Sequence, residues 1–280
     1  MVVAIIHKTT HAAAKQRVEL RSKATLLSAG GPGAGGFLLY PTEPLCALED
    51  VDWSTSLRRR LQLPRPECSL AELARASATC CNQTAGGATC AAPLDEDGYH
   101  ACTCQSGGGV VRRHGDLEKT LGSLAGRWRH CAPLYEQRVP AWDRLRARRP
   151  AEGPGPPVLE RAVLDLQYAE VDGPWWVDVT VRHPAAGDDA AVRAAARRTG
   201  EASRRAEREK HSRYPGDRLT AFAVEIGGRL GAEAREWLLA HVRELPEDAQ
   251  PRELARAYQV ISCAVQRRRA LQLRRAAGLR

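Results

Sequence analysis

The sequence has no long apolar run and no internal repeat. Within its 280 residues no apolar stretch approaches the roughly 20 residues of a membrane span. The apolar run at residues 1–6 is too short for the core of a secretory signal. These absences predict a soluble, intracellular protein without a membrane partner.

Lysine is also scarce. Lysine and arginine together number 42, but only five are lysines, and Lys210 is the one lysine after Lys119. The net charge is +9, and basic residues gather in residues 193–214 and 252–280. Basic helical faces of this kind indicate a polyanion partner, with nucleic acid as the first choice and a solvated face as the alternative. The arginines expected to contact it include Arg204, Arg205 and Arg208.

Cysteine is not lacking: nine occur, five of them between positions 80 and 104. Clustering around a histidine and an odd count favour metal ligation over a disulfide framework. His100 and Cys104 are four residues apart, and Cys90 precedes His100 by ten, so these three are predicted ligands of a structural zinc ion. Cys102 is a competing thiol, and free buried cysteines are the alternative to a metal site. The candidates for the fourth ligand are Cys80, Cys81 and His114.

His114 has a second interpretation. A helical spacing of apolar residues from 116 to 128 predicts a helix that begins just after His114. At the amino end of that helix, His114 could contact phosphate beside Arg112 and Arg113.

The rest of the chain predicts a mixed α/β layer. Residues 1–29 look weakly structured, 30–36 read as a flexible break, and 37–40 as a short strand. From residue 115 onward the expected order is helix, strand, strand, strand, helix, strand, helix. Asp188 or Asp189 is expected to cap a long helix that runs to about Tyr214, and residues 219–226 form the last strand.

Two acids occupy the expected central hairpin. Residues 161–168 and 175–182 alternate polar and apolar side chains on either side of a turn signal at 170–174. A hairpin symmetric about the midpoint of residues 171 and 172 would set Asp165 opposite Asp178, on the face away from the core, with Cβ atoms roughly 5 Å apart. Facing carboxylates repel unless one takes a proton or a cation lies between them, and Mg²⁺ suits such oxygen ligands. The alternative is a solvent-facing hairpin with two incidental acids.

The basic helix supplies a partner for these acids. Lys210 and Tyr214 are four residues apart and share one helical face. A lysine beside two metal-binding carboxylates can orient a water or stabilise charge on a phosphate, which together describes metal-assisted phosphodiester hydrolysis. Glu136, on the preceding strand, is a candidate third acid. An ordinary surface ion pair is the alternative for Lys210.

These residues resemble a known family. Asp165, Asp178 followed by Val-Thr-Val, Glu209-Lys210 and Tyr214 are similar to the restriction-like endonuclease domain at the C-terminus of certain non-long-terminal-repeat retrotransposon polyproteins, of the kind abundant in dinoflagellate and other protist genomes. Residues 95–100, Cys104 and 107–114 resemble the zinc-knuckle segment that precedes that domain, and the resemblance spans residues 33–276. No reverse transcriptase motif occurs, so the chain resembles a detached C-terminal portion.

The resemblance implies a restriction-endonuclease-like mixed sheet flanked by helices and preceded by a loop-rich zinc-binding segment. It implies Mg²⁺ on Asp165 and Asp178, target DNA and element RNA as partners, a nick that primes reverse transcription, and a nuclear location that follows from the substrate alone. Related bacterial enzymes carry a lysine at the position of Thr180, so Lys210 would serve from the helix. The zinc ligands assigned with it are Cys81, Cys90, His100, Cys104 and His114.

The expected organisation follows from these assignments. A basic N-terminal segment (1–36), a helical linker region (37–78), a zinc-knuckle-like segment (79–114), the nuclease domain (115–245) and a basic C-terminal helix (246–280) succeed one another. Two other functions remain open: a non-catalytic, zinc-containing nucleic-acid-binding remnant of such an element, and a host repair or recombination nuclease of the same fold.

Overall fold

The computed structural model describes residues 20–63, 79–95, 98–129, 132–148, 152–170 and 173–279. Residues 1–19 of the expected N-terminal segment and 64–78 of the expected linker lie outside this part. The helices are α2 (Leu20–Ser28), α3 (Asp50–Arg60), α5 (Tyr99–Thr103), α6 (Gly109–Arg129), α7 (Asp189–Arg197), α8 (Glu201–Arg213), α9 (Ala232–Arg243) and α10 (Gln250–Ala276). Short 3-10 turns are η1 (Gly36–Leu38), η2 (Pro44–Cys46), η3 (Ser106–Gly108) and η4 (Pro140–Trp142).

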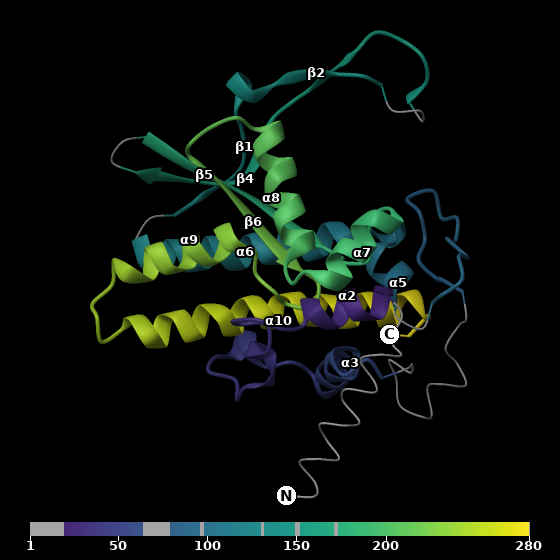
Figure 1. The fold of residues 1–280 in the computed structure, drawn as a ribbon, viewed down its shortest axis with the longest axis horizontal. Coiled ribbons are helices and arrows are strands. Elements are labelled where there is room, and N and C mark those ends of the chain that lie inside the picture. Colours follow the sequence, from purple (N-terminus) through teal and green to yellow (C-terminus); the bar gives the residue numbers. More distant parts are fainter. Residues whose placement is uncertain are drawn as a thin grey trace, which may run out of the picture.

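A four-stranded mixed sheet forms the centre, in the order β1-β4-β5-β6. Its strands are β1 (Leu134–Arg138), β4 (Val163–Glu170), β5 (Gly173–Arg182) and β6 (Leu219–Glu225). The first three are antiparallel, and β6 runs parallel to β5 after the crossover through α7 and α8. A separate two-stranded ribbon, β2 (Arg144–Arg146) with β3 (Val158–Glu160), leaves the sheet between β1 and β4 (Figure 1). The sequence therefore predicted the mixed α/β class and the sheet's strand content.

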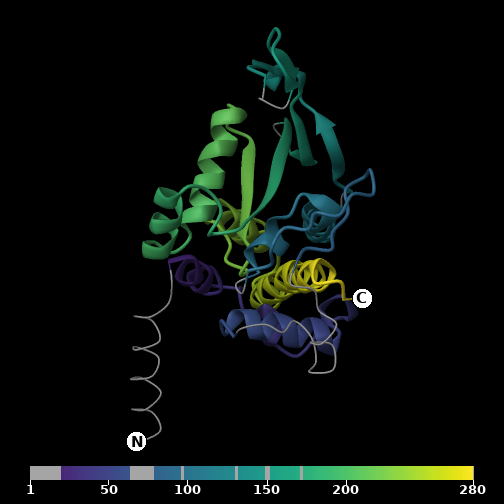
Figure 2. The ribbon, with the colours of Figure 1, turned by 90° about the vertical axis from the view of Figure 1, so that its right-hand side faces the viewer.

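Helices cover both faces of this sheet. Figure 2 shows α7 and α8 on one side of the strands and α6 on the other. The main core lies between the sheet and α6, α9 and α10, where Val177 and Val179 of β5 pack with Leu121 of α6 and Trp237 of α9. Every residue of β6 is buried, as expected for a parallel strand covered on both faces.

The long helix α10 is central to the fold. It packs against α3, α6, α9 and the η1 turn, and Arg269, Gln259 and Gln266 are among its fully buried side chains. A Cβ at Gly36 would lie 2.9 Å from the Cα of Gln259, so only glycine allows η1 to approach this closely. Residues 30–40 are thus a packed turn region on α10, where a flexible break and a short strand had been expected.

Two helix boundaries differ from the sequence prediction. α6 begins at Gly109, so His114 lies in its second turn instead of ahead of it. The expected long helix from 189 is divided into α7 and α8, because Gly200 takes a left-handed conformation with φ 73°. Asp188 caps α7 as expected, since its carboxylate accepts a 2.8 Å hydrogen bond from the Ala191 N–H. In the part of the chain that the structure describes, no helix is long and apolar enough to cross a membrane.

Candidate acid centre and metal site

The β4–β5 hairpin brings the two predicted acids to one place. Glu170 pairs with Gly173, and the ladder continues to Leu166 opposite Val177. Asp165 and Asp178 are the next residues along the two strands, which matches the predicted register, although the ladder does not pair them. The predicted alternation fails at Asp165, because Leu164 packs with Tyr214 whereas Leu166 packs in the main core. The backbone ladder ends here because the Asp165 side chain itself accepts the Val179 N–H, at 2.5 Å. The two carboxylates interact closely enough to shift each other's pKa.

Asp178 is the more deeply enclosed acid, with 3% of its surface exposed. Burial, together with the neighbouring Asp165 carboxylate, raises the pKa of Asp178 to about 7, although Lys210 opposes the shift. The Lys210 ammonium of α8 lies 2.6 Å from the Asp178 carboxylate. Without a further cation, Asp178 therefore takes a proton near neutral pH.

Asp165 is bound by two donors. The imidazole Nε2 of His114 lies 2.9 Å from one carboxylate oxygen, while the Val179 N–H occupies the other. Burial raises the pKa of Asp165, but the His114 contact and the Val179 bond outweigh it, so the net shift is downward. The same contact raises the pKa of His114 despite burial. The negative charge of the pair therefore lies on Asp165, and a proton occupies Asp178 below about pH 7.

A further buried acid escaped the sequence analysis. Glu118 lies one helical turn after His114 on α6 and is buried. Burial and the Asp165 carboxylate raise the pKa of Glu118. The signal for it was the spacing of four residues between His114 and Glu118, which sets both on the helical face that meets Asp165. An acid-rich centre of Glu118, Asp165 and Asp178 results.

Glu136 and Tyr214 have different surroundings from those three acids. Glu136 is exposed and falls opposite Asp165 in the β1–β4 register, where a left-handed backbone at φ 49° interrupts the pairing. Tyr214 is buried and stacks on Trp142 with ring centroids 5.9 Å apart. Burial and then the Asp178 charge raise the pKa of Tyr214 to about 12. Its observed contacts are packing contacts at the end of α8.

A basic groove adjoins the acid centre. It has a volume of about 520 Å³ and contains Lys210 and a single acid, Glu209. Arg205 and Arg208, both predicted to bind nucleic acid, line it, and the remaining residues come from β2, β5 and α8: Arg144, Arg182, Ser212 and Arg213. This defines the arginine groove, in which five guanidinium groups and one ammonium surround a space that opens to solvent.

The other arginines of the prediction lie elsewhere. Arg204 pairs with Glu201 at 3.0 Å, outside the groove. Arg112 is exposed and donates to the Gly107 carbonyl. Arg113 is only 3% exposed and donates to the Cys102 carbonyl at 3.1 Å and to Gln272 at 2.5 Å. The expected phosphate contact by Arg113 is therefore wrong, because its guanidinium is enclosed between α5 and α10.

A Cys₃His cluster is present upstream of the sheet. Its ligand atoms, from Cys80, Cys90, His100 and Cys104, all lie within 4.8 Å of one another. Within the described ranges, no other group of three or more His, Cys, Asp or Glu side chains brings its ligand atoms so near to one another. Three thiols and one imidazole at this separation suit a tetrahedral structural ion such as zinc.

The local fold explains this ligand set. Cys80 and Cys90 lie on the two sides of a small hairpin, in which the Cys80 N–H donates to the Ala92 carbonyl and the Cys90 N–H to the Asn82 carbonyl, both at 2.8 Å. His100 and Cys104 follow on and after α5, whose first N–H groups are capped by the Asp95 carboxylate at 2.7 Å. The ligands therefore span 25 residues and need only a hairpin and one helical turn.

The structure selects Cys80 among the predicted alternatives. Cys81, the next residue, points to the other side of the strand, and its sulfur would lie 3.2 Å from a Cβ at Gly278. His114 contacts Asp165 and is not a ligand. Cys102 is buried beside Arg269 and Arg113. Cys81 and His114 in the predicted ligand set were thus replaced by Cys80.

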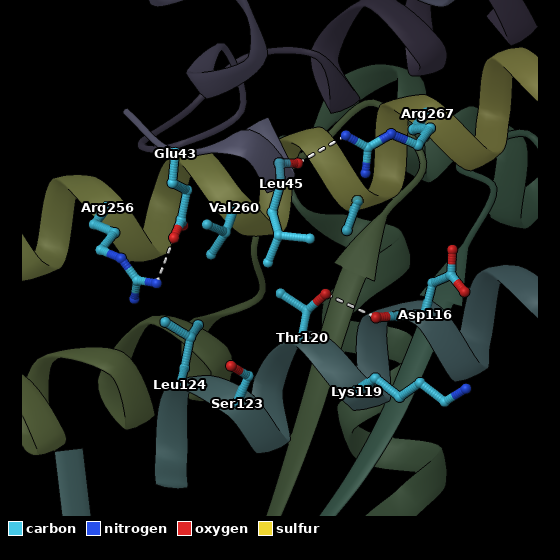
Figure 3. Close-up of a pocket in the computed structure, with 11 residues that line it drawn as sticks. Glu43, Leu45, Asp116, Lys119, Thr120, Ser123, Leu124, Arg256, Val260 and Arg267 are labelled. Carbon is cyan, nitrogen blue, oxygen red and sulfur yellow. Dashed lines mark hydrogen bonds and ion pairs between the residues drawn. The ribbon is translucent and has the colours of Figure 1, made fainter. Parts of the chain in front are cut away.

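The opposite face of α6 borders a separate pocket. Figure 3 shows it between α6, α10 and the η2 segment, with a volume of about 240 Å³. Its charged groups are largely engaged, since Glu43 pairs with Arg256 at 2.7 Å and Arg267 donates to the Leu45 carbonyl at 2.7 Å. It contains none of the acid-centre residues, which lie on the sheet side of α6.

No protein-family model, curated protein or solved structure matches this chain. The functional argument therefore depends on the geometry of the two centres.

Proposed function

We propose that the protein is a metal-dependent DNA endonuclease whose active centre is built on Asp165, Asp178 and Lys210. The observation that carries the proposal is the pair of buried Asp178 and half-buried Asp165, with the Lys210 ammonium 2.6 Å from Asp178, at the edge of the arginine groove. Hydrolysis of a phosphodiester requires a water to be activated and negative charge on the phosphate to be stabilised. The acids would bind the metal that activates the water, and Lys210 and the groove arginines would stabilise the charge on the phosphate.

The acid centre fits a hard divalent cation such as Mg²⁺. Burial and the neighbouring Asp165 carboxylate raise the pKa of Asp178 to about 7, a shift that a cation between the two carboxylates would reverse. Asp165 and Asp178 would hold the ion. Glu118 is a third carboxylate nearby, close enough to Asp165 for the Asp165 charge to raise its pKa. When bound, the metal would lower the pKa of a coordinated water and polarise the phosphate.

The chain's own groups have distinct roles in this proposal. Lys210 opposes the rise in the pKa of Asp178 and presents its ammonium to the phosphate. His114 orients Asp165 through its 2.9 Å contact. The groove arginines bind phosphates on either side of the bond to be cleaved and determine strand position without reading base sequence.

Two further features support the restriction-like assignment within this proposal. The sheet order β1-β4-β5-β6, with a helix before it and a two-helix crossover to a parallel last strand, is compatible with such a fold. The Cys₃His segment lies immediately before α6, as a zinc knuckle would. We extend the proposal to an origin in a retrotransposon, nicking of target DNA in the nucleus, and element RNA as a second partner.

The test is Mg²⁺-dependent nicking of supercoiled plasmid by the wild type and by Asp178→Asn. Loss of a metal ligand that contributes several kcal/mol of transition-state stabilisation predicts a rate about 10³-fold lower. Asp248→Asn, an exposed acid outside the centre, is the matched control and should nick at the wild-type rate.

A different outcome would favour the non-catalytic alternative. If the wild type shifts plasmid on a gel in a salt-sensitive manner but never nicks it, with or without added Mg²⁺, Mn²⁺ or Ca²⁺, the chain is a binding module. A host repair or recombination nuclease is distinguished by its genomic context, namely whether a reverse transcriptase reading frame lies upstream.

A further inference from the structure

The β2–β3 ribbon stands away from the body of the molecule in both views (Figures 1 and 2). We define the arm as residues 144–148 and 152–160, which comprise β2, β3 and the described parts of the connection between them. Arg144 pairs with Glu160, Leu145 with Leu159 and Arg146 with Val158. An isolated two-stranded ribbon is marginally stable in water, so a persistent one needs support at its base or a partner along its length.

Support exists at the base of the arm. Trp142 stacks on Tyr214, and the Asp143 carboxylate accepts the Ala162 N–H at 2.8 Å. Glu160 lies 3.3 Å from Arg213 of α8. The arm is thereby attached to the helix that carries Lys210.

The remainder of the arm lacks such support. Leu145 is 71% exposed and Leu159 is 52% exposed, although they are cross-strand partners. Successive side chains of a strand alternate between its faces, so the two leucines share one face and the charged residues share the other. A single exposed leucine is ordinary, whereas a paired apolar face on a projecting ribbon indicates a surface that another molecule covers.

Charge on the arm indicates what that molecule is. The described arm carries Arg144, Arg146 and Arg148, and its two acids are each within 2.9 Å of an arginine nitrogen. It therefore presents no free carboxylate to repel an anion. Arg144 also lines the arginine groove together with Lys210. A polyanion bound in the groove would continue along the arm.

We propose that the arm lies in the major groove of duplex DNA beside the cleavage position, with Leu145 and Leu159 against the base edges. This inference rests on DNA being the substrate. The major groove, about 12 Å wide, admits a two-stranded ribbon as built, whereas the minor groove, about 6 Å wide, would have to open. Apolar side chains contact the thymine methyl group there. Arg148, which is exposed and donates to the carbonyl oxygens of Pro156 and Glu152, reaches backbone phosphate beside the ribbon. The ladder of three residues covers about 10 Å, the length of about three base pairs.

The experiment measures binding of a 30-base-pair mixed-sequence duplex by fluorescence anisotropy without Mg²⁺, so that no strand is cut. The double variant Leu145→Ala, Leu159→Ala should bind about tenfold more weakly than the wild type. The matched control, Leu39→Ala with Leu61→Ala, removes two leucines of comparable exposure, 61% and 57%, far from the arm, and should leave affinity unchanged. Thermal unfolding of each variant confirms that it folds.

A second experiment determines which groove of the DNA duplex the arm occupies. A duplex whose cytosines carry glucosyl-hydroxymethyl groups has its major groove obstructed, and netropsin occupies the minor groove of AT-rich duplexes. Wild-type affinity should fall on the glucosylated duplex, and the leucine double variant should lose that sensitivity. Competition by netropsin without sensitivity to glucosylation, or equal affinities for the double variant and the wild type, overturns the inference.

Failure of the inference and failure of the proposed function give different results. If the wild type nicks plasmid and the arm variants bind the duplex as tightly as the wild type, the nuclease proposal stands and the arm has no role in DNA binding. A wild type that binds no duplex and nicks no plasmid overturns both. If the leucine face is instead a protein contact, the variants will change self-association in sedimentation experiments while duplex affinity stays constant.

Discussion

The acid centre and the Cys₃His cluster are both candidate metal sites, but they are built in different ways. The cluster takes four ligands from residues 80–104, held by one hairpin and one helical turn. The acid centre joins side chains from α6, β4, β5 and α8, about a hundred residues apart. The cluster's soft thiols match zinc, whereas the carboxylates carry unbalanced charge that a proton or a hard cation must neutralise. The cluster therefore depends on one short segment of the chain, whereas the acid centre depends on how four elements pack together.

The largest effect is expected from a substitution that removes one ligand of the Cys₃His cluster. Cys80→Ser should abolish binding of one zinc equivalent, measured by metal analysis of the purified protein, and should destabilise the segment by several kcal/mol because structural zinc contributes folding free energy directly. The control is Cys81→Ser, which changes the adjacent thiol outside the cluster and should keep zinc and stability. Loss of zinc in the Cys81 variant with retention in the Cys80 variant would contradict the ligand assignment.

The next effect concerns the assembled site. Glu118→Gln preserves side-chain volume but removes a buried carboxylate near Asp165, so plasmid nicking should fall by about 10- to 100-fold, as for residues that support metal ligands. Zinc content should stay at one equivalent. Glu236→Gln on the exposed side of α9 is the control. Unchanged nicking by the Glu118 variant would limit the centre to Asp165 and Asp178.

A smaller effect distinguishes the two sites by pH. In the folded, Mg²⁺-free protein the pKa of Asp178 is raised from 3.8 to about 7, so the folded state binds more protons than the unfolded state between these values. Stability from this group is fully present below pH 3.8 and is lost as pH rises through 7. Urea unfolding should show about 1 kcal/mol less stability at pH 8 than at pH 6 from this group.

The raised pKa of His114 acts in the same direction, whereas burial lowers the pKa of His183 to about 3 and that of His241 to about 4, so these two make stability rise with pH. The Asp178 contribution therefore needs its own control. Asp178→Asn removes it, so the stability of the wild type minus that of the variant should fall from pH 6 to pH 8. Saturating Mg²⁺ should remove the same fall. A difference that stays constant or rises over this range would contradict the raised pKa of Asp178.

The smallest effect tests the groove beside the assembled site. Arg204 and Arg208 both pair with Glu201 and are both largely exposed, but only Arg208 lines the arginine groove. Arg208→Gln should weaken duplex binding a few-fold and lower the slope of log affinity against log salt by about 0.9, the value for one lost phosphate contact. Arg204→Gln should leave the slope unchanged. Equal effects of the two would indicate general charge attraction without a defined groove.

Several parts of the fold could be predicted because they depend on short-range patterns. Alternation and a central turn set the β4–β5 register that brings Asp165 next to Asp178. The four-residue spacing of His100 and Cys104 correctly predicted two ligands of the cluster. The cap by Asp188 could be predicted because a short carboxylate side chain accepts a hydrogen bond from the first N–H groups of a helix. The break at Gly200 was missed, because helix propensity on both sides masked a single glycine.

Other features were beyond sequence because they depend on contacts across the chain. The choice of Cys80 over Cys81 follows from which face of a short hairpin meets α5. The sequence predicts that Arg113 binds phosphate, but in the structure α10 encloses its guanidinium, which donates to Gln272. The basic C-terminal helix has a charged composition, yet Arg269 and Arg274 are buried within the fold.

The sequence by itself determined the carboxylate pair, three of the four cluster ligands and the strands that carry them, since hydrogen-bonding periods and ligand spacings act over a few residues. Only the tertiary structure decided that His114 and Glu118 meet Asp165, that Lys210 reaches Asp178, and that the arginines of β2, β5 and α8 line one groove. These contacts result from packing α6 and α8 on opposite faces of one sheet, and burial of apolar surface is non-directional, so no local pattern encodes them.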